Sequence, residues 1–566
     1  MPMPAGLPAR IIRLFATALG AACVILAPAA ARAQQAAPPA GVPLAQRLMA
    51  ASQFDSAARV LEGMVASAPD NGPAWLALGR ARRQLGQSAG AAEALQRAHA
   101  VPATRRPATL QLFLLAADAG PSDEAARRLG EVRALGFDFT TVVGNREVAK
   151  LKGDPRFAAL FPDSGAFAPA FDEKVRVIHE WRGEVVGGEF GWIARGIGDV
   201  DGDRVEDVAV SAPANPPAGD GRGEVFAYSG RSGRKLWRQV GDSTARLGFA
   251  LEAAGDVNRD GVPDVVAGAP GIGAVLVFSG RDGAELLRLR GDSTDQGLGN
   301  SASGIGDFNG DGHADIAAGA PGSTASGAPA GRAFVFSGKD GARLLTLDGE
   351  APNGGFGSAV GGADGKFLLV GAVGGGPSQR GRVYVYDRLT RTPRFVKDAD
   401  ETGAAFGGMF LSVAGDVNAD GTQDIFVSDF PNSAKGPSTG RGYVFSGKDG
   451  APILVATGEA GEGFGIGAAK TGDVNRDGHD DLVVGAWQHS SKAWSGGRIV
   501  VVSGKDGTTL RTMTGTVPGE TLGFDAVGIG DVDGDGNIDF LVTSAWSVVN
   551  GYRTGRTWVV AGEPPR

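Results

Sequence analysis

One nine-residue pattern recurs six times along the 566-residue chain, each time just ahead of a short apolar run. It reads D-x-[DN]-x-D-G-x-x-D, with an arginine replacing the glycine once, and its copies begin at Asp199, Asp256, Asp307, Asp416, Asp473 and Asp531. This spacing turns side-chain oxygens at positions 1, 3, 5 and 9 toward one point, and a glycine at position 6 permits a tight turn. The loops are therefore predicted to hold a hard divalent cation, calcium above all.

The later positions of the pattern separate this loop from an EF-hand, which opens with the same hexapeptide but requires a bidentate glutamate at position 12. Position 12 is apolar in all six copies, which have Val210, Ala267, Ala318, Val427, Val484 and Val542 there. An ordinary Asp/Asn/Gly turn between two strands is the plainer alternative. Six copies in register, each with aspartate at position 9, favour the metal loop.

The N-terminus has the features of a secretory signal peptide. Arg10 and Arg13 precede an apolar run over 14–26, and residues 31–33 read Ala-Arg-Ala, a small-residue cleavage site. A membrane anchor is the alternative, but the run is short for a span. We expect residues 1–33 to be removed and the protein to be exported to the periplasm, the cell surface or the medium. Cys23, the single cysteine, falls inside this segment.

Composition narrows the class of partner. The formal net charge is -8, whereas nucleic-acid-binding surfaces are basic, so no nucleic-acid partner is expected. The 92 glycines indicate many turns and close packing of small residues. No stretch beyond the N-terminal segment approaches the length of a membrane span.

Between residues 41 and 161 a helical pattern repeats every 34 residues. Trp75, Leu78 and Gly79 occupy positions typical of a tetratricopeptide repeat, and Pro102 closes that unit. This region resembles a short tetratricopeptide array, whose groove would take a peptide or a helix; a plain amphipathic bundle is the alternative. Residues 162–173, rich in proline, glycine and alanine, are predicted to be a linker.

A second repeat, of 51 to 58 residues where copies of the loop are adjacent, governs residues 174–562. The unit over 286–338 contains four short strand-like runs, and the aspartate loop lies between the second and third of them. Four strands per unit at this period are typical of the blades of a β-propeller.

The repeated units resemble the FG-GAP repeats of integrin α-subunit propellers. Gly268-Ala269-Pro270 and Gly319-Ala320-Pro321 give the GAP element intact. The FG element stands seven times, as Phe190-Gly191, Leu247-Gly248, Leu298-Gly299, Phe356-Gly357, Phe406-Gly407, Phe464-Gly465 and Leu522-Gly523. The resemblance implies a multidomain protein in which a small all-α region precedes an all-β propeller of seven blades.

The ends of the repeat region predict how the ring closes. The last strand-like run, 556–560, lacks the outer strand that follows every earlier unit, and an orphan run over 175–181 precedes the first FG element. We expect 175–181 to pair with 556–560, because an open ring would expose unpaired strand edges.

The resemblance also implies the calcium ligands: side chains at positions 1, 3, 5 and 9 of each loop, with the backbone carbonyl at position 7. Up to six sites are expected. Arg204 at position 6 makes the first of them weaker, and the fourth unit keeps only Asp364 and holds no metal. The ligand side chains are Asp199, Asp201, Asp203, Asp207, Asp256, Asn258, Asp260, Asp264, Asp307, Asn309, Asp311, Asp315, Asp416, Asn418, Asp420, Asp424, Asp473, Asn475, Asp477, Asp481, Asp531, Asp533, Asp535 and Asp539.

Catalysis finds little support in the sequence. Two G-x-S-x-G matches, at 86–90 and 436–440, lie outside the strand-to-helix elbow that this motif requires. His313 and His479 fill a variable loop position and are expected to face solvent. The expected function is that of an exported, calcium-binding, non-catalytic adhesion, protein-interaction or scaffold module, with a protein or glycan ligand on a propeller face. A hydrolase or lyase acting on polysaccharide or lipid and a purely structural surface component are the alternatives.

Overall fold

The computed structural model describes residues 41–162, 170–214, 221–549 and 552–564. The chain divides into two compact units, with the boundary between Phe161 and Pro162. The predicted signal peptide, Cys23 and most of the predicted linker lie outside the described residues. No helix among the described residues combines the length and apolar character needed to cross a membrane.

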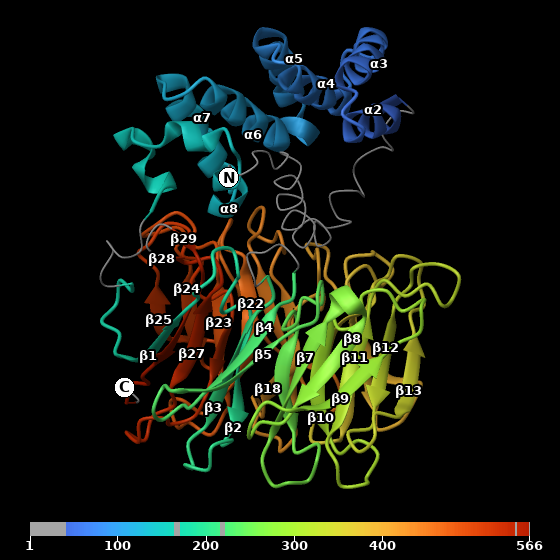
Figure 1. Ribbon diagram of the computed structural model, residues 1–566, viewed down its shortest axis with the longest axis vertical. Helices are drawn as coiled ribbons and strands as arrows, with labels where there is room; N and C mark the ends of the chain where they lie inside the picture. Colours follow the sequence, from blue (N-terminus) through green and yellow to red (C-terminus); the bar gives the residue numbers. More distant parts are fainter. Residues whose placement is uncertain (1–40, 163–169, 215–220, 550–551, 565–566) are drawn as a thin grey trace, which may run out of the picture. The chain divides into compact units, whose positions relative to one another are not determined.

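The first unit is built of helices (Figure 1). Gly79 shows why its helices pack closely, because a Cβ at this position would lie 2.5 Å from Cγ of Leu95 on the next helix. The small residue therefore permits the helix contact that the repeat pattern predicted. The elements are α2 (Gly41–Ala50), α3 (Phe54–Ser67), α4 (Gly72–Gln84), α5 (Ser88–Ala100), α6 (Pro102–Asp118), α7 (Asp123–Ala134), α8 (Phe139–Val143), η2 (Val148–Leu151) and η3 (Pro155–Leu160).

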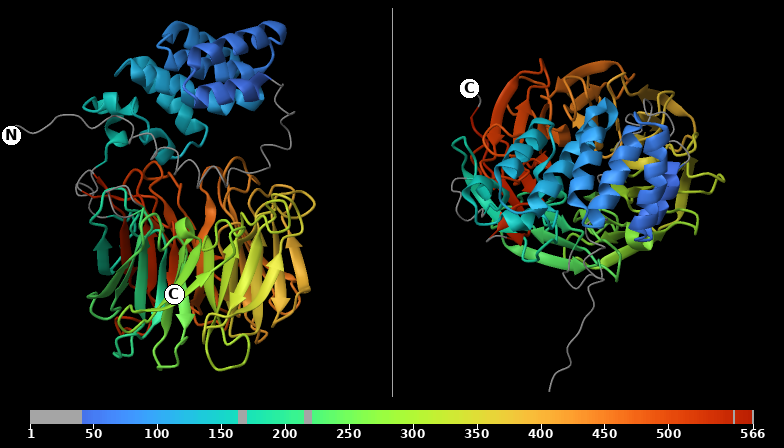
Figure 2. Two further views of the ribbon diagram at one scale, coloured as in Figure 1. Left: turned by 45° about the vertical axis from the view of Figure 1, so that its right-hand side comes forward. Right: turned by 90° about the horizontal axis from the view of Figure 1, so that it is seen from above.

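The second unit is a seven-bladed β-propeller, as predicted, and each blade is a four-stranded antiparallel sheet (Figures 1 and 2). Blade 1 contains β2 (Ala194–Gly198), β3 (Asp207–Ala212), β4 (Glu224–Tyr228) and β5 (Lys235–Val240). Blade 2 contains β6 (Leu251–Gly255), β7 (Asp264–Ala269), β8 (Ala274–Phe278) and β9 (Glu285–Arg290), with the short helix η5 (Pro270–Ile272) between β7 and β8. Blade 3 contains β10 (Ser301–Gly306), β11 (Asp315–Ala320), β12 (Arg332–Phe336) and β13 (Arg343–Asp348).

Blade 4 contains β14 (Phe356–Ala363), β15 (Phe367–Ala372), β16 (Arg382–Asp387) and β17 (Pro393–Asp398). Blade 5 contains β18 (Leu411–Gly415), β19 (Asp424–Asp429), β20 (Arg441–Phe445) and β21 (Pro452–Thr457). Blade 6 contains β22 (Phe464–Gly472), β23 (Asp481–Ala486), β24 (Arg498–Val502) and β25 (Thr509–Thr514). The first strand of each blade is innermost. Innermost strands of neighbouring blades contact one another around the ring, and β26 of the last blade contacts β2 of the first.

Blade 7 is assembled from both ends of the propeller sequence. It contains β26 (Ala526–Gly528), β27 (Phe540–Ser544), β30 (Arg556–Val560) and β1 (Val177–Arg182), in that order, and the small hairpin of β28 (Val548–Val549) and β29 (Tyr552–Arg553) lies between β27 and β30 in sequence. Strand β1 pairs antiparallel with β30, with Trp181 opposite Thr557. The outer edge of blade 7 is thereby covered by a strand that precedes blade 1 in sequence.

The glycines of the FG and GAP elements hold neighbouring blades together. The N–H of Gly299 donates to the carbonyl of Gly319 within blade 3, at 3.1 Å. The carbonyl of the same Gly299 faces blade 2, where a Cβ on Gly268 would lie 2.0 Å from it. Gly299 also has φ of 91°, a region that side-chain-bearing residues avoid. The two motifs are therefore two halves of one contact between blades.

Candidate metal-binding loops

The six aspartate loops occupy equivalent places in six blades, between the innermost strand and the second strand. The loop begins directly after the innermost strand in five blades and two residues later, at Asp531, in blade 7. Its position 9 is part of, or directly precedes, the second strand. Blade 4 has no room for such a loop, because β14 ends at Ala363 and β15 begins at Phe367.

Hydrogen bonds from the loop backbone to its own side chains fix each loop, and blade 6 shows the pattern. Asp473 at position 1 accepts the N–H groups of Asp477 and Gly478, at 2.9 and 2.8 Å. Asn475 at position 3 accepts the same Asp477 N–H at 3.0 Å, and Asp477 at position 5 accepts the N–H of His479 at 3.1 Å. The side chains at positions 1, 3 and 5, which are predicted to bind the metal, thus surround one turn of the backbone.

Two positions of each loop adopt left-handed backbone conformations. Position 6 has φ of 71° at Arg204 and 82° at Gly261, so the arginine does occupy the strained region that the sequence indicated. Position 4 is also left-handed in all six loops, with φ of 63° at Arg259 and 58° at Ala419, and this requirement was missed. Non-glycine residues there cost of order 1 kcal/mol each.

Position 9 has a structural role that the ligand pattern did not reveal. The Asp481 side chain is fully buried. It accepts backbone N–H groups from Val474 (2.9 Å) and Asn475 (3.3 Å) inside the loop, and from Gly504 (3.0 Å) after the third strand. Burial raises the pKa of Asp481 to about 6 despite these bonds. The carboxylate therefore ties the loop to the outer part of its own blade.

The glycine partner of position 9 could have been found in the sequence. A Cβ on Gly504 would lie 1.9 Å from the carbonyl of Asp480, so the approach requires glycine. A glycine donates to the position 9 aspartate in each of the six blades. In blade 4, which lacks the loop, Asp387 ends the third strand and Arg388 follows it in place of a glycine. The six glycines are Gly230, Gly280, Gly338, Gly447, Gly504 and Gly562.

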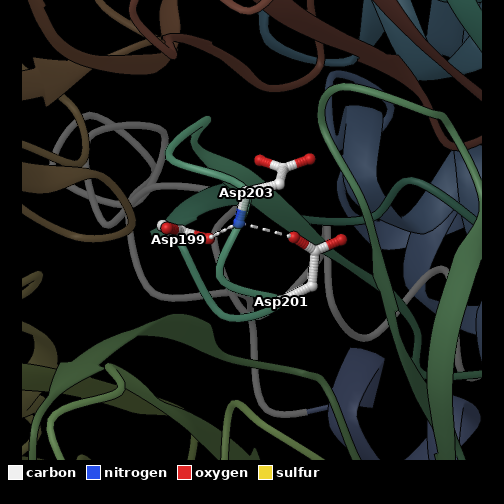
Figure 3. A group of neighbouring side chains, drawn as sticks. All are labelled: Asp199, Asp201 and Asp203. Carbon is white, nitrogen blue, oxygen red and sulfur yellow. Dashed lines mark hydrogen bonds between the residues drawn. The ribbon is translucent and has the colours of Figure 1, made fainter.

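The acidic side chains predicted as ligands lie close together in the two all-aspartate loops. Oxygens of Asp199, Asp201 and Asp203 lie within 4.8 Å of one another, as do those of Asp531, Asp533 and Asp535. Figure 3 shows Asp199 and Asp201 both reaching the backbone nitrogen of Asp203, at 3.0 and 3.2 Å. Calcium–oxygen distances of about 2.3–2.6 Å allow two ligands of one ion to lie about 5 Å apart, so this oxygen-only donor set fits calcium. Asp207 and Asp539 at position 9 lie outside these close groups.

Arginines partly neutralise the loop carboxylates. Arg176, just ahead of β1, contacts Asp533 at 2.5 Å and Asp535 at 2.9 Å, and Arg231 contacts Asp203 at 3.2 Å. These arginine side chains are more than half exposed, so the pairs contribute little stability by themselves.

Neighbouring loops are joined across the blade boundaries. Nδ1 of His479 lies 2.7 Å from the carbonyl oxygen of Val417 in the loop of blade 5, and Nδ1 of His313 lies 2.7 Å from that of Val257 in the loop of blade 2. Both histidines are half-buried, so the expectation that they face solvent was wrong. They link adjacent loops, because position 7 of one loop lies against position 2 of the loop before it.

Neither G-x-S-x-G match lies at a nucleophile elbow. Ser88 is the first residue of α5 and follows another helix, and Ser438 lies in the connection between β19 and β20. Both places lack the strand-to-helix turn that exposes a catalytic serine in that motif.

Comparison with known proteins supports both parts of the fold. The FG-GAP repeat model matches residues 250–278 and 299–336, and a tetratricopeptide repeat model matches residues 48–112. Integrin alpha-6 of Gallus gallus is 31% identical over 148 residues, which cover 24% of this chain and 13% of that protein. Integrin alpha-IIb of Homo sapiens is 39% identical over 90 residues, or 15% of this chain and 8% of that protein. The chain therefore spans only a small part of the length of these relatives.

Proposed function

We propose that this chain, a seven-bladed propeller of FG-GAP repeats preceded by a tetratricopeptide-like helical region, is an exported calcium-dependent interaction module. The observation that carries the proposal is the loop itself, which has the same left-handed positions and the same bonds to its carboxylates in six blades. The chain would lose a signal peptide over residues 1–33. Residues 41–161 would form the helical module and residues 162–173 the linker, and residues 174–562 would form the propeller.

Calcium would act on the ring as well as on each loop. The ligands would be the side chains at positions 1, 3, 5 and 9, and the bound ion would remove the mutual repulsion of their carboxylates. The N–H of Asp480 in the loop of blade 6 donates to the carbonyl of Asp416 in the loop of blade 5, at 3.2 Å. Ordering one loop would therefore restrain the next. Affinities near a Kd of about 10⁻⁴ M are expected for extracellular calcium modules.

The partners proposed for the module are a protein or glycan on a propeller face and a peptide or helix in the groove of the helical unit. The similarity to integrin α-subunits supports the first of these roles. In the alternative, a purely structural protein would have the same calcium loops, and calcium would only make the propeller more rigid. Such a protein would capture no partner.

Partner capture in calcium tests the proposal. The full mature chain is immobilised, incubated with envelope and culture-supernatant extracts in calcium, and eluted with a chelator. We expect a reproducible protein or glycan to be released, and to be missing when Asp256, Asp307, Asp416 and Asp473 are changed to alanine. A folded wild-type chain that captures nothing would favour the purely structural role.

A further inference from the structure

A serine, a histidine and a glutamate form a hydrogen-bonded relay in blade 6, outside the metal loops. Oγ of Ser491 lies 2.6 Å from Nε2 of His489, and Nδ1 of the same ring lies 2.5 Å from Oε1 of Glu462. His489 and Ser491 belong to the connection between β23 and β24, and Glu462 lies two residues before the start of β22. Ser491 is exposed, while the side chains of His489 and Glu462 are only 13% and 5% exposed.

The other blades show which part of this relay serves the fold. In blade 7, Glu520 pairs with Arg556 at 2.8 Å, and the buried Ser547 donates directly to the same carboxylate at 2.7 Å. In blade 6, Arg498 makes the equivalent pair with Glu462, at 3.0 Å. Arg498 thus supplies to Glu462 the same arginine–glutamate pair that Arg556 and Glu520 form in blade 7. The imidazole and the exposed hydroxyl are additions specific to blade 6 among the described residues.

The surroundings of Glu462 keep it ionised and oriented. Burial favours its neutral form, but hydrogen bonds from His489 and from the N–H of Glu459, together with Arg498, hold its pKa below the usual value. In a neutral imidazole, an ionised carboxylate favours the tautomer that carries its proton on Nδ1, so that Nε2 can accept from the serine hydroxyl. This is the arrangement by which a carboxylate and a histidine activate a serine, on whatever fold they occur.

Donors for a developing negative charge are also at hand. The backbone N–H groups of Ser491 and Lys492 make no hydrogen bond within the part of the chain that the structure describes. The N–H of the residue after a serine nucleophile commonly contributes to an oxyanion hole. Both groups are close to the serine in sequence and available to a carbonyl oxygen bound beside it.

We infer that Ser491, His489 and Glu462 form a nucleophile, base and carboxylate that hydrolyse carboxylic esters. Oγ of Ser491 forms a bond to the acyl carbon as its proton passes to Nε2 of His489. The ester C–O bond then breaks, and the leaving alkoxide takes that proton. Water attacks the acyl-serine, with His489 accepting and returning a proton, to release the acid. This activity goes beyond the binding role and would replace the expectation that the chain is non-catalytic.

The test uses the full chain with a fluorophosphonate probe and with p-nitrophenyl acetate. We expect mass spectrometry to locate the phosphonate on Ser491, and S491A and H489Q each to lower ester hydrolysis by about 100-fold or more, in line with the loss of a positioned base. S490A is the matched control, because Ser490 is the neighbouring exposed hydroxyl and bonds Gln488 and Ser495 in the same loop. Its rate should equal that of the wild type.

Two results would overturn the inference. One is a folded wild-type chain, by circular dichroism, that takes no phosphonate at Ser491. The other is S491A that keeps the wild-type rate while H489Q loses it, because the imidazole alone would then attack the ester. Rates measured in chelator and in calcium should agree, so this outcome is independent of the proposed calcium role.

Discussion

Replacing Asp481 by alanine is expected to destabilise the propeller by about 3 kcal/mol or more, with or without calcium. The fully buried carboxylate of Asp481 accepts three backbone N–H groups, from Val474, Asn475 and Gly504. Alanine leaves the buried N–H of Gly504 and the half-buried N–H groups of Val474 and Asn475 without an acceptor, and an unsatisfied buried donor costs about 1–3 kcal/mol. Denaturant unfolding of the full chain, in chelator and in calcium, measures the loss.

Asp473→Ala in the same loop is the matched comparison. Asp473 at position 1 is half-buried, and its partner Gly478 is exposed, so water can replace the lost acceptor in the metal-free protein. We expect this variant to resemble the wild type in chelator but to lose the stabilisation that calcium confers. Equal destabilisation of the two variants in chelator would contradict the separate structural role of position 9.

Glu520→Ala is expected to cost about 3–5 kcal/mol, because it leaves the buried Arg556 with only the more distant and more exposed Glu180, at 3.4 Å, as an acidic partner in blade 7. The side chains of Glu520 and Arg556 are 1% and 5% exposed. Arg556 opens β30, the strand that pairs with β1 to close the ring. Early loss of blade 7 should therefore appear as faster hydrogen exchange in β1 than in the innermost strands.

A surface pair provides the control for this change. Lys435 and Glu459 lie 2.7 Å apart, but their side chains are 47% and 69% exposed. Glu459→Ala should therefore cost about 1 kcal/mol or less. If Glu520→Ala cost no more than Glu459→Ala, the buried network would not be what secures the last blade.

The blades could be predicted because their repeat carries the physical requirements of the fold. Gly268 and Gly299 are needed where two blades touch, so the motif in the sequence and the contact in the structure are the same feature. The spacing of the carboxylates likewise predicted the turn that gathers the side chains at positions 1, 3 and 5 of each loop, while their role as calcium ligands stays a prediction. The sequence spacing did not show that Asp481 ties the loop to its own blade, because its partner Gly504 lies 23 residues later, after β24.

Other features could not be predicted because they depend on how blades meet. His479 looked like a residue in a variable loop position, and only the fold brings it to Val417 of the preceding blade. The relay of blade 6 was missed for the same reason. Glu462 is 27 residues from His489 in sequence, and Ser491 belongs to no recognised nucleophile motif.

Calorimetric titration of the full chain with calcium tests the central claim most directly. The account predicts heat from up to six sites with Kd on the order of 10⁻⁴ M. In the variant with Asp256, Asp307, Asp416 and Asp473 changed to alanine, only the loops that begin at Asp199 and Asp531 should still contribute. A folded wild-type chain that gives no heat at millimolar calcium would contradict the assignment of these loops as calcium sites.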